Sequence, residues 1–320
     1  MDIKHKWALG GIVFFISAVV FLSGPRVEID TRIHPVSLPQ DLDRFLVGSE
    51  SRFDDIVPGT EKIIFWARGK GIRTPFSVIY LHGFSASRKE TAPLADIVAQ
   101  KLCANVFYTR FTGHGRTSQA MLDGSVNAWL NDGAQALTIG QRIGEKIVVI
   151  GTSTGGTIAA WLATQPAAGN VAAFILISPN FGPANRMAKI LLLPWGGNIA
   201  ELLIGRERAF KPDNPGHEKY WTCRYPTRAL LPMMGVVRLA ASADLSRIKA
   251  PVLVIYSPSD RVVDSALTET AFKKIGAARK LLVPYTGSSD PDQHVLAGDI
   301  LSPASTQVLG TIISDFILGL

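Results

Sequence analysis

Residues 147–155 read Ile147-Val148-Val149-Ile150-Gly151-Thr152-Ser153-Thr154-Gly155 and carry the strongest structural signal in the chain. Their first four residues form a continuous apolar run, which is typical of a strand buried on both faces of a parallel sheet. The run stops at Gly151, and the small residues that follow predict a helix over about 155–163. The G-x-S-x-G spacing predicts a sharp strand-to-helix turn, in which Ser153 is held in a strained backbone conformation above the sheet.

Strand-like and helix-like patterns alternate on both sides of this turn. Apolar runs predict strands at 63–66, 78–81, 106–108, 174–177, 252–256 and 280–283, and helical spacing predicts helices at 94–102, 125–144 and 305–318. Such alternation predicts an α/β domain over residues 61–320, with a mainly parallel sheet and helices on both faces.

One interval is too long for this rhythm. Ser178 and Pro251 are separated by 72 residues, whereas the other strand-to-strand intervals are about half as long. The interval contains apolar helical pieces, so we expect an inserted helical cap at about 184–245. The cap has nine Lys and Arg against five Asp and Glu, and therefore carries +4 of the chain's net charge of +7.

The N-terminus is apolar and preceded by positive charge. Residues 7–25 lack charged side chains, and Lys4 and Lys6 come before them. This pattern predicts an uncleaved signal anchor or transmembrane helix over residues 1–24, with the rest of the chain exported across the membrane to a periplasmic or other extracytoplasmic space. A cleaved signal peptide followed by secretion and a buried N-terminal helix are the alternatives. Residues 25–60, rich in Pro, Asp and Arg, are expected to form a linker and wrapping segment.

Composition excludes several protein classes. Of the 320 residues, 47% are hydrophobic, which is enough apolar surface to exclude a disordered chain. Two cysteines exclude a disulfide scaffold and a cysteine-rich zinc site. We expect Cys103 and Cys223 to be buried or isolated thiols. The positive charge accompanies no recognised nucleic-acid-binding module, so no nucleic-acid partner is expected.

A serine nucleophile needs a general base, and the base needs a carboxylate to orient it. In this architecture the chain order is serine, acid, histidine. Asp260 follows the strand predicted at 252–256, and His294 lies between the last predicted strand and the last helix, so we predict Asp260 as the acid and His294 as the base. Asp264 is the alternative acid, although its position also suits a helix N-cap.

Backbone N–H groups are expected to stabilise the negative charge that develops on the substrate oxygen. One donor should be Thr154, directly after the nucleophile, and the other should come from the loop after an earlier strand, which we assign to Phe84. His82 and His114 lie in neighbouring loops, and we expect them to hydrogen-bond loop backbone rather than to act as bases.

With these residues in place, the chain resembles the α/β-hydrolase superfamily over about residues 60–320. The resemblance rests on His82-Gly83-Phe84, Gly113-His114-Gly115, Gly151 to Gly155, Asp260 and His294, in that order. Within the superfamily it is most similar to the branch of lysophospholipases, monoacylglycerol lipases and serine aminopeptidases, in which a helical cap is inserted before the strand that bears the acid.

The resemblance implies a serine esterase or lipase with a Ser-His-Asp triad that acts on a small-molecule ester, such as a lipid, without a metal or an organic cofactor. Amide or peptide hydrolysis and acyl transfer by the same triad are alternatives. A binding protein on a non-catalytic hydrolase fold is a further one. The acyl and alcohol parts of the substrate and the oligomeric state are not predicted.

Overall fold

The computed structural model describes residues 3–320, without the side chains of residues 3, 4, 6, 8–10 and 13. Its centre is a seven-stranded sheet in the order β1-β3-β2-β4-β5-β8-β9, parallel except for β1. The strands are β1 Ile63–Phe65, β2 Thr74–Leu81, β3 Asn105–Tyr108, β4 Gly144–Thr152, β5 Val171–Ile177, β8 Val252–Tyr256 and β9 Lys280–Pro284. The prediction of a mainly parallel sheet is confirmed.

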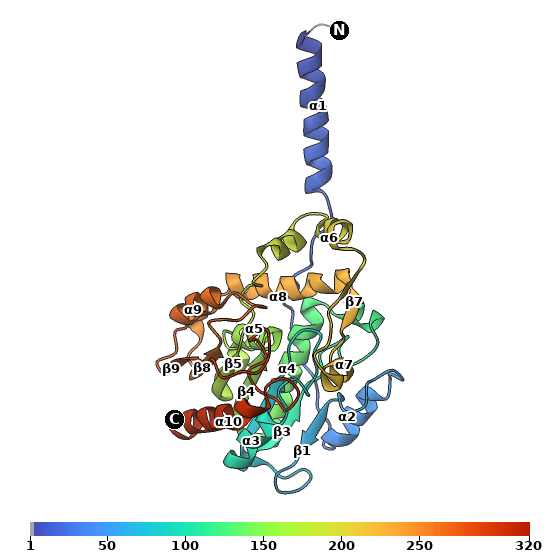
Figure 1. Cartoon of the computed structure of the whole chain (residues 1–320). Helices are drawn as coiled ribbons and strands as arrows, with labels where there is room; N and C mark the ends of the chain where they lie inside the picture. The colour runs from blue at the N-terminus through green and yellow to red at the C-terminus, as the bar shows by residue number, and fades with distance from the viewer. Residues whose placement is uncertain (1–2) are drawn as a thin grey trace.

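Helices cover both faces of this sheet (Figure 1). One face packs against α3 and α10, and the other against α4, α5 and α8. The helices of the domain are α2 Leu42–Glu50, α3 Leu94–Leu102, α4 Val126–Ile143, α5 Thr154–Leu162, α6 Gly196–Ile204, α7 Pro215–Tyr220, α8 Leu230–Ser242, α9 Ser265–Lys274 and α10 Pro303–Leu318. Short 3₁₀ segments are η1 Gln119–Asp123, η2 Pro166–Asn170, η3 Arg186–Leu192, η4 Thr227–Ala229 and η5 Leu245–Arg247.

The apolar run of β4 is buried on both faces because its side chains alternate between two cores. Val148 and Ile150 point to the core with α3 and α10, whereas Ile147 and Val149 point to the core with α4 and α5. Each of these four side chains has no exposed surface. Burial on both sides explains why a continuous apolar run, rather than an alternating one, forms this strand.

The N-terminal helix α1 (Ile3–Leu22) stands clear of the domain, close to α6 (Figure 1). Among the residues that the structure describes, none of the helices combines the length and the apolar character needed to cross a bilayer. The predicted transmembrane segment over residues 1–24 is therefore not supported.

Residues 25–60 wrap along the domain, and they contain a helix that the sequence pattern did not indicate. The side-chain amides of Asn127 and Asn131 in α4 donate hydrogen bonds of 2.8 and 2.9 Å to the Arg32 carbonyl oxygen. Further on, α2 buries Leu42 and Leu46 in the core that contains α4. The sequence did not predict this helix because residues 25–60 are rich in Pro, Asp and Arg, a composition that favours a linker.

The segment at 184–245 is not wholly helical. Between α6 and α8 lie two short strands, β6 Glu207–Ala209 and β7 Arg224–Pro226, which pair in antiparallel fashion. The last helix of the segment, α8, packs against α5 and buries Met234 and Val236 in the core of the domain. The cap was predicted as a helical insertion, so the β6–β7 pair is a correction to that expectation.

Candidate active site

Ser153 lies in a tight turn between β4 and α5. Its backbone has φ 52° and ψ −118°, a conformation that side-chain-bearing residues rarely adopt and that costs about 1–3 kcal/mol. A Cβ atom at Gly155 would collide with the Leu81 carbonyl oxygen, and one at Gly151 would lie 2.6 Å from the Gly155 carbonyl oxygen. The two glycines therefore allow the strand and the helix to approach closely enough to hold Ser153 in the turn.

His294 and Asp260 form a hydrogen-bonded pair. The His294 Nδ1 lies 2.8 Å from Asp260 Oδ2, and both side chains are buried. Asp260 follows β8 and is fixed in place because its Oδ1 accepts the N–H groups of Val262 and Val263 at 2.8 and 2.9 Å. With Nδ1 engaged, Nε2 is the ring nitrogen left to exchange a proton with a nucleophile.

The backbone of His294 is held from two sides. Ser178 Oγ donates a 2.7 Å hydrogen bond to the His294 carbonyl oxygen. Asp290 Oδ2 accepts the N–H groups of His294 and Val295 at 2.9 and 2.7 Å. Burial lowers the pKa of His294, but the Asp260 carboxylate, with Glu90 and Asp290, outweighs burial, so the pKa is raised.

The two backbone donors predicted for the oxyanion lie beside Ser153. Thr154 is the first residue of α5, where an N–H group has no partner within the helix. Phe84 follows Gly83, whose backbone lies so close to Ser153 that an added Cβ would be 3.1 Å from Ser153 Cβ. Both residues line the same cavity as Ser153 and His294.

The two loop histidines contact backbone, as expected. His82 Nδ1 lies 2.8 Å from the Gly83 carbonyl oxygen, and its Nε2 accepts the Phe111 N–H at 3.0 Å. Burial lowers the pKa of His82 and lowers that of His114 to about 4. The expectation that His82 constrains the loop is therefore confirmed by its hydrogen bonds.

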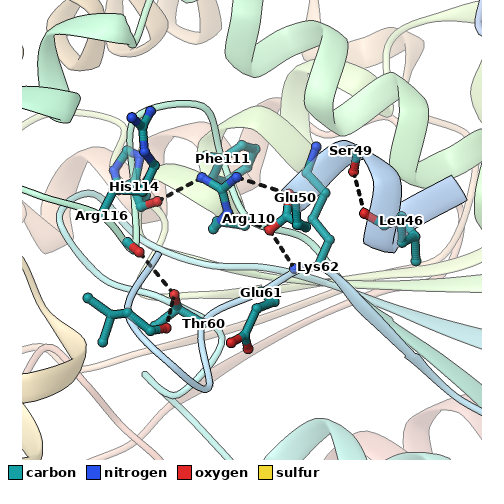
Figure 2. Close-up of polar contacts among 12 residues, drawn as sticks. Leu46, Ser49, Glu50, Thr60, Glu61, Lys62, Arg110, Phe111, His114 and Arg116 are labelled. Atoms are coloured by element: carbon teal, nitrogen blue, oxygen red, sulfur yellow. Dashed lines mark hydrogen bonds and ion pairs between the residues drawn. The ribbon is translucent and has the colours of Figure 1, made fainter. Parts of the chain in front are cut away.

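A buried ion pair ties the N-terminal wrapping segment to this loop (Figure 2). Arg110 donates hydrogen bonds of 2.7 and 2.9 Å to the two carboxylate oxygens of Glu50 at the end of α2. The same guanidinium donates a 3.0 Å hydrogen bond to the His114 carbonyl oxygen. Because Phe111 follows Arg110 and donates to His82, residues 50, 110 and 82 form one connected support for the turn beside Ser153.

A cavity of about 870 Å³ opens above the site. Its floor contains Ser153 and His294, and its walls come largely from the segment at 184–245. Most of those wall residues are apolar, and they include Leu191, Leu203, Trp221, Tyr225 and Met233. Arg208 and Lys211 add positive charge to the same wall. Such a cavity suits a substrate with an extended apolar part.

The alternative acid, Asp264, takes a structural position at the start of a helix. Asp264 is the N-cap of α9, where its carboxylate accepts the Ala266 N–H at 3.1 Å, as its sequence position indicated.

Cys103 and Cys223 are both free thiols. In the part of the chain that the structure describes, no cluster of three or more His, Cys, Asp or Glu side chains could hold a metal ion.

One buried group in the cavity was not found from the sequence. Glu90, between β2 and α3, lines the cavity, and burial raises its pKa to about 7. Nothing in its sequence context marks it, because it stands in a polar loop where a glutamate is ordinarily exposed.

The sheet order, the turn at Ser153 and the positions of Asp260 and His294 together define an α/β-hydrolase. The chain belongs to the serine aminopeptidase S33 family, which residues 75–289 match. It is 26% identical over 216 residues to a thermostable monoacylglycerol lipase from Bacillus sp. (strain H-257), covering 67% of this chain and 82% of that protein.

Solved structures show the same fold. A structure from a report on two metagenome-derived lipolytic enzymes, LipS and LipT, superimposes with a TM-score of 0.68 at 21% identity. The match covers 83% of this chain and all of that one. A soluble variant of monoglyceride lipase from Saccharomyces cerevisiae, in complex with a substrate analog, superimposes with a TM-score of 0.61 at 17% identity. The match covers 81% of this chain and 90% of that one. The prediction of a hydrolase of the lipase and esterase branch is confirmed at this level.

Proposed function

We propose that the protein cleaves carboxylic esters of the monoacylglycerol or lysophospholipid type through a triad of Ser153, His294 and Asp260. The observation that carries the proposal is the 2.8 Å contact of His294 with Asp260 in the same cavity that Ser153 lines. The apolar cap wall supports an acyl chain as part of the substrate. The match to a monoacylglycerol lipase supports the same class.

The mechanism follows from these positions. Ser153 Oγ forms a bond to the ester carbonyl carbon while His294 Nε2 takes the hydroxyl proton. The N–H groups of Phe84 and Thr154 donate to the resulting oxyanion, and Asp260 stabilises the imidazolium. The imidazolium returns its proton to the leaving alcohol. Water then attacks the acyl-serine, again losing a proton to His294, and releases the carboxylic acid with Ser153 restored.

The first test removes the nucleophile. Ser153→Ala is expected to abolish hydrolysis of a short-chain nitrophenyl ester and labelling by a fluorophosphonate probe, while the variant stays folded by circular dichroism. The matched control is Ser246→Ala, which removes an exposed serine and should label and hydrolyse like wild type. Wild-type rates in Ser153→Ala would rule out the assigned nucleophile.

The competing chemistries use the same residues and are separated by substrate. Rates on monoacylglycerol, lysophospholipid and aminoacyl-anilide substrates should rank the esters first. A clear preference for the anilide would favour amide or peptide hydrolysis. Transfer of the acyl group to an added alcohol in place of water would favour an acyltransferase.

We likewise propose that the catalytic domain is exported. This proposal rests on Lys4 and Lys6 ahead of the apolar residues 7–23. Protease added to spheroplasts, in which a periplasmic domain is accessible, should digest the domain, and complete protection that is lost only on lysis would contradict export.

A further inference from the structure

Glu90 is a buried carboxyl group in the cavity that takes no part in the triad. We propose that Glu90 is a positioning residue, which holds the Gly83–Phe84 turn against Ser153 and places its charge beside His294. This inference rests on the proposed ester hydrolysis, because in it Glu90 keeps the Phe84 N–H aligned with the oxyanion that forms during that reaction.

The carboxyl group joins two elements of the site through one oxygen atom. Glu90 Oε2 accepts the Gly83 N–H at 2.8 Å and the Tyr80 hydroxyl at 2.9 Å. The Tyr80 oxygen also lies 3.2 Å from Oγ1 of Thr152, the residue directly before the nucleophile. Glu90 therefore connects the turn that carries the Phe84 N–H to the strand end that carries Ser153.

The turn has little room to move while Glu90 is bound. A Cβ atom on Gly83 would lie 2.5 Å from Glu90 Oε1 and 3.1 Å from Ser153 Cβ, so the Gly83 backbone is enclosed between the two side chains. Because the Gly83 N–H is fixed on one side of this backbone, the next peptide, with the Phe84 N–H, is fixed with it. Loss of the carboxyl group would free the turn to tilt away from the oxyanion.

Charge links Glu90 to the general base as well. Glu90 accepts the hydroxyl of Tyr80 in β2 and lines the same cavity as His294 after β9, whose charge lowers the pKa of Glu90. His294 in turn faces Asp260 after β8, Asp290 in its own loop, and Glu90. Where Glu90 is ionised, above its pKa of about 7, the carboxylate favours the imidazolium form, so removal of its charge should lower the pKa of His294.

Two variants of Glu90 separate its role as a hydrogen-bond acceptor from the effect of its negative charge. Glu90→Gln keeps an oxygen acceptor for the Gly83 N–H but carries no charge. We expect its kcat to stay within a few-fold of wild type and the acidic limb of its kcat/KM profile to move to lower pH. Glu90→Ala removes both properties, and we expect kcat to fall by about 10- to 100-fold with KM little changed, as for a misaligned transition-state donor.

The matched control is Glu61→Gln. The Glu61 carboxylate also accepts a glycine N–H, that of Gly59 at 3.0 and 2.9 Å, but Glu61 does not line the cavity. This variant should keep the wild-type kcat and pH profile. All rates are normalised to the folded fraction, measured by thermal unfolding.

The outcomes distinguish this inference from the function on which it rests. An inactive wild type and an inactive Glu61→Gln would contradict the proposed ester hydrolysis itself. If the wild type is active, three results would each overturn the inference about Glu90 alone. These are an unshifted kcat/KM pH profile in Glu90→Gln, a wild-type kcat in Glu90→Ala, and equal kcat values in Glu90→Gln and Glu90→Ala. If Glu90→Ala does not fold, the profile of Glu90→Gln decides.

Discussion

The Glu90 carboxyl group shows how one buried residue couples the proton equilibrium of the active site to the stability of the fold. Burial opposes its ionisation and outweighs the hydrogen bonds from Gly83 and Tyr80, so its pKa is about 7 instead of the usual 4.5. Between these two pH values the folded protein keeps a proton that the unfolded chain releases. The free energy of unfolding should therefore decrease as the pH rises through this window.

This behaviour predicts a pH-dependent effect of Glu90→Gln. The wild type should lose up to roughly 3 kcal/mol of stability from this group between pH 4.5 and 7. Glutamine cannot ionise, so the stability of the variant relative to wild type should be higher at pH 8 than at pH 5. Urea unfolding at the two pH values measures the difference, with the exposed Glu207→Gln as control. Parallel pH curves for Glu90→Gln and wild type would contradict the raised pKa.

At the scale of elements, the β4–α5 unit depends on backbone contacts that tolerate no side chain. Gly155 faces the end of β2, and Gly151 faces Gly155 across the turn. The helix begins directly after Ser153, so its unpaired N–H groups and its dipole are directed at the proposed nucleophile. The two glycines thus allow the close packing of β2, β4 and α5, and this packing fixes the position of Ser153.

Gly155→Ala is therefore expected to destabilise the protein by at least about 1–3 kcal/mol, since its Cβ would overlap the Leu81 carbonyl oxygen. Esterase activity should fall further than the folded fraction, because the turn is displaced. Gly169→Ala is the control: Gly169 is exposed, no atom lies within 4 Å of the added Cβ, and stability should change by less than about 0.5 kcal/mol. Equal unfolding midpoints for the two variants would refute this packing argument.

At the scale of the whole molecule, the N-terminal wrapping segment is part of the active-site support. Its helix α2 ends at Glu50, which is buried with Arg110 in the loop after β3 (Figure 2). The Lys62 N–H, just before β1, also donates to Glu50 at 3.1 Å. One carboxylate thus joins the wrapping segment, the sheet edge and the loop that holds His82.

Breaking this pair should be costly. Glu50→Ala leaves the Arg110 guanidinium buried without its partner, and the expected loss of stability is about 3–5 kcal/mol. Glu207→Ala breaks an exposed pair with Arg224 and should cost no more than about 1 kcal/mol. Chemical denaturation of both variants tests the contrast. A loss for Glu50→Ala no larger than that of the control would show that the wrapping segment adds little to the fold.

The seven strands, the turn at Ser153 and the order Ser153, Asp260, His294 could be predicted from the sequence because each has a local signature. A buried strand is a run of apolar residues, and a tight turn beside a serine needs glycines at fixed spacing. Asp264 also had a local signature, that of an N-cap, and the structure confirms it. The transmembrane assignment came from an uncharged apolar stretch preceded by Lys4 and Lys6, and the described helices do not support it.

Other features depend on residues that meet only after folding. Glu90 has a raised pKa because the folded chain buries it, an effect that outweighs the hydrogen bonds from Gly83 and Tyr80, and its own neighbours in the chain do not show this burial. Glu50 and Arg110 are 60 residues apart. The helix α2 lies in a segment with the composition of a linker, and β6 and β7 are too short for a periodic pattern. The order of the elements and the candidate triad follow from local patterns in the sequence. Which groups are buried together depends on the packed fold, because desolvation and hydrogen bonding between distant segments arise only once the chain is packed.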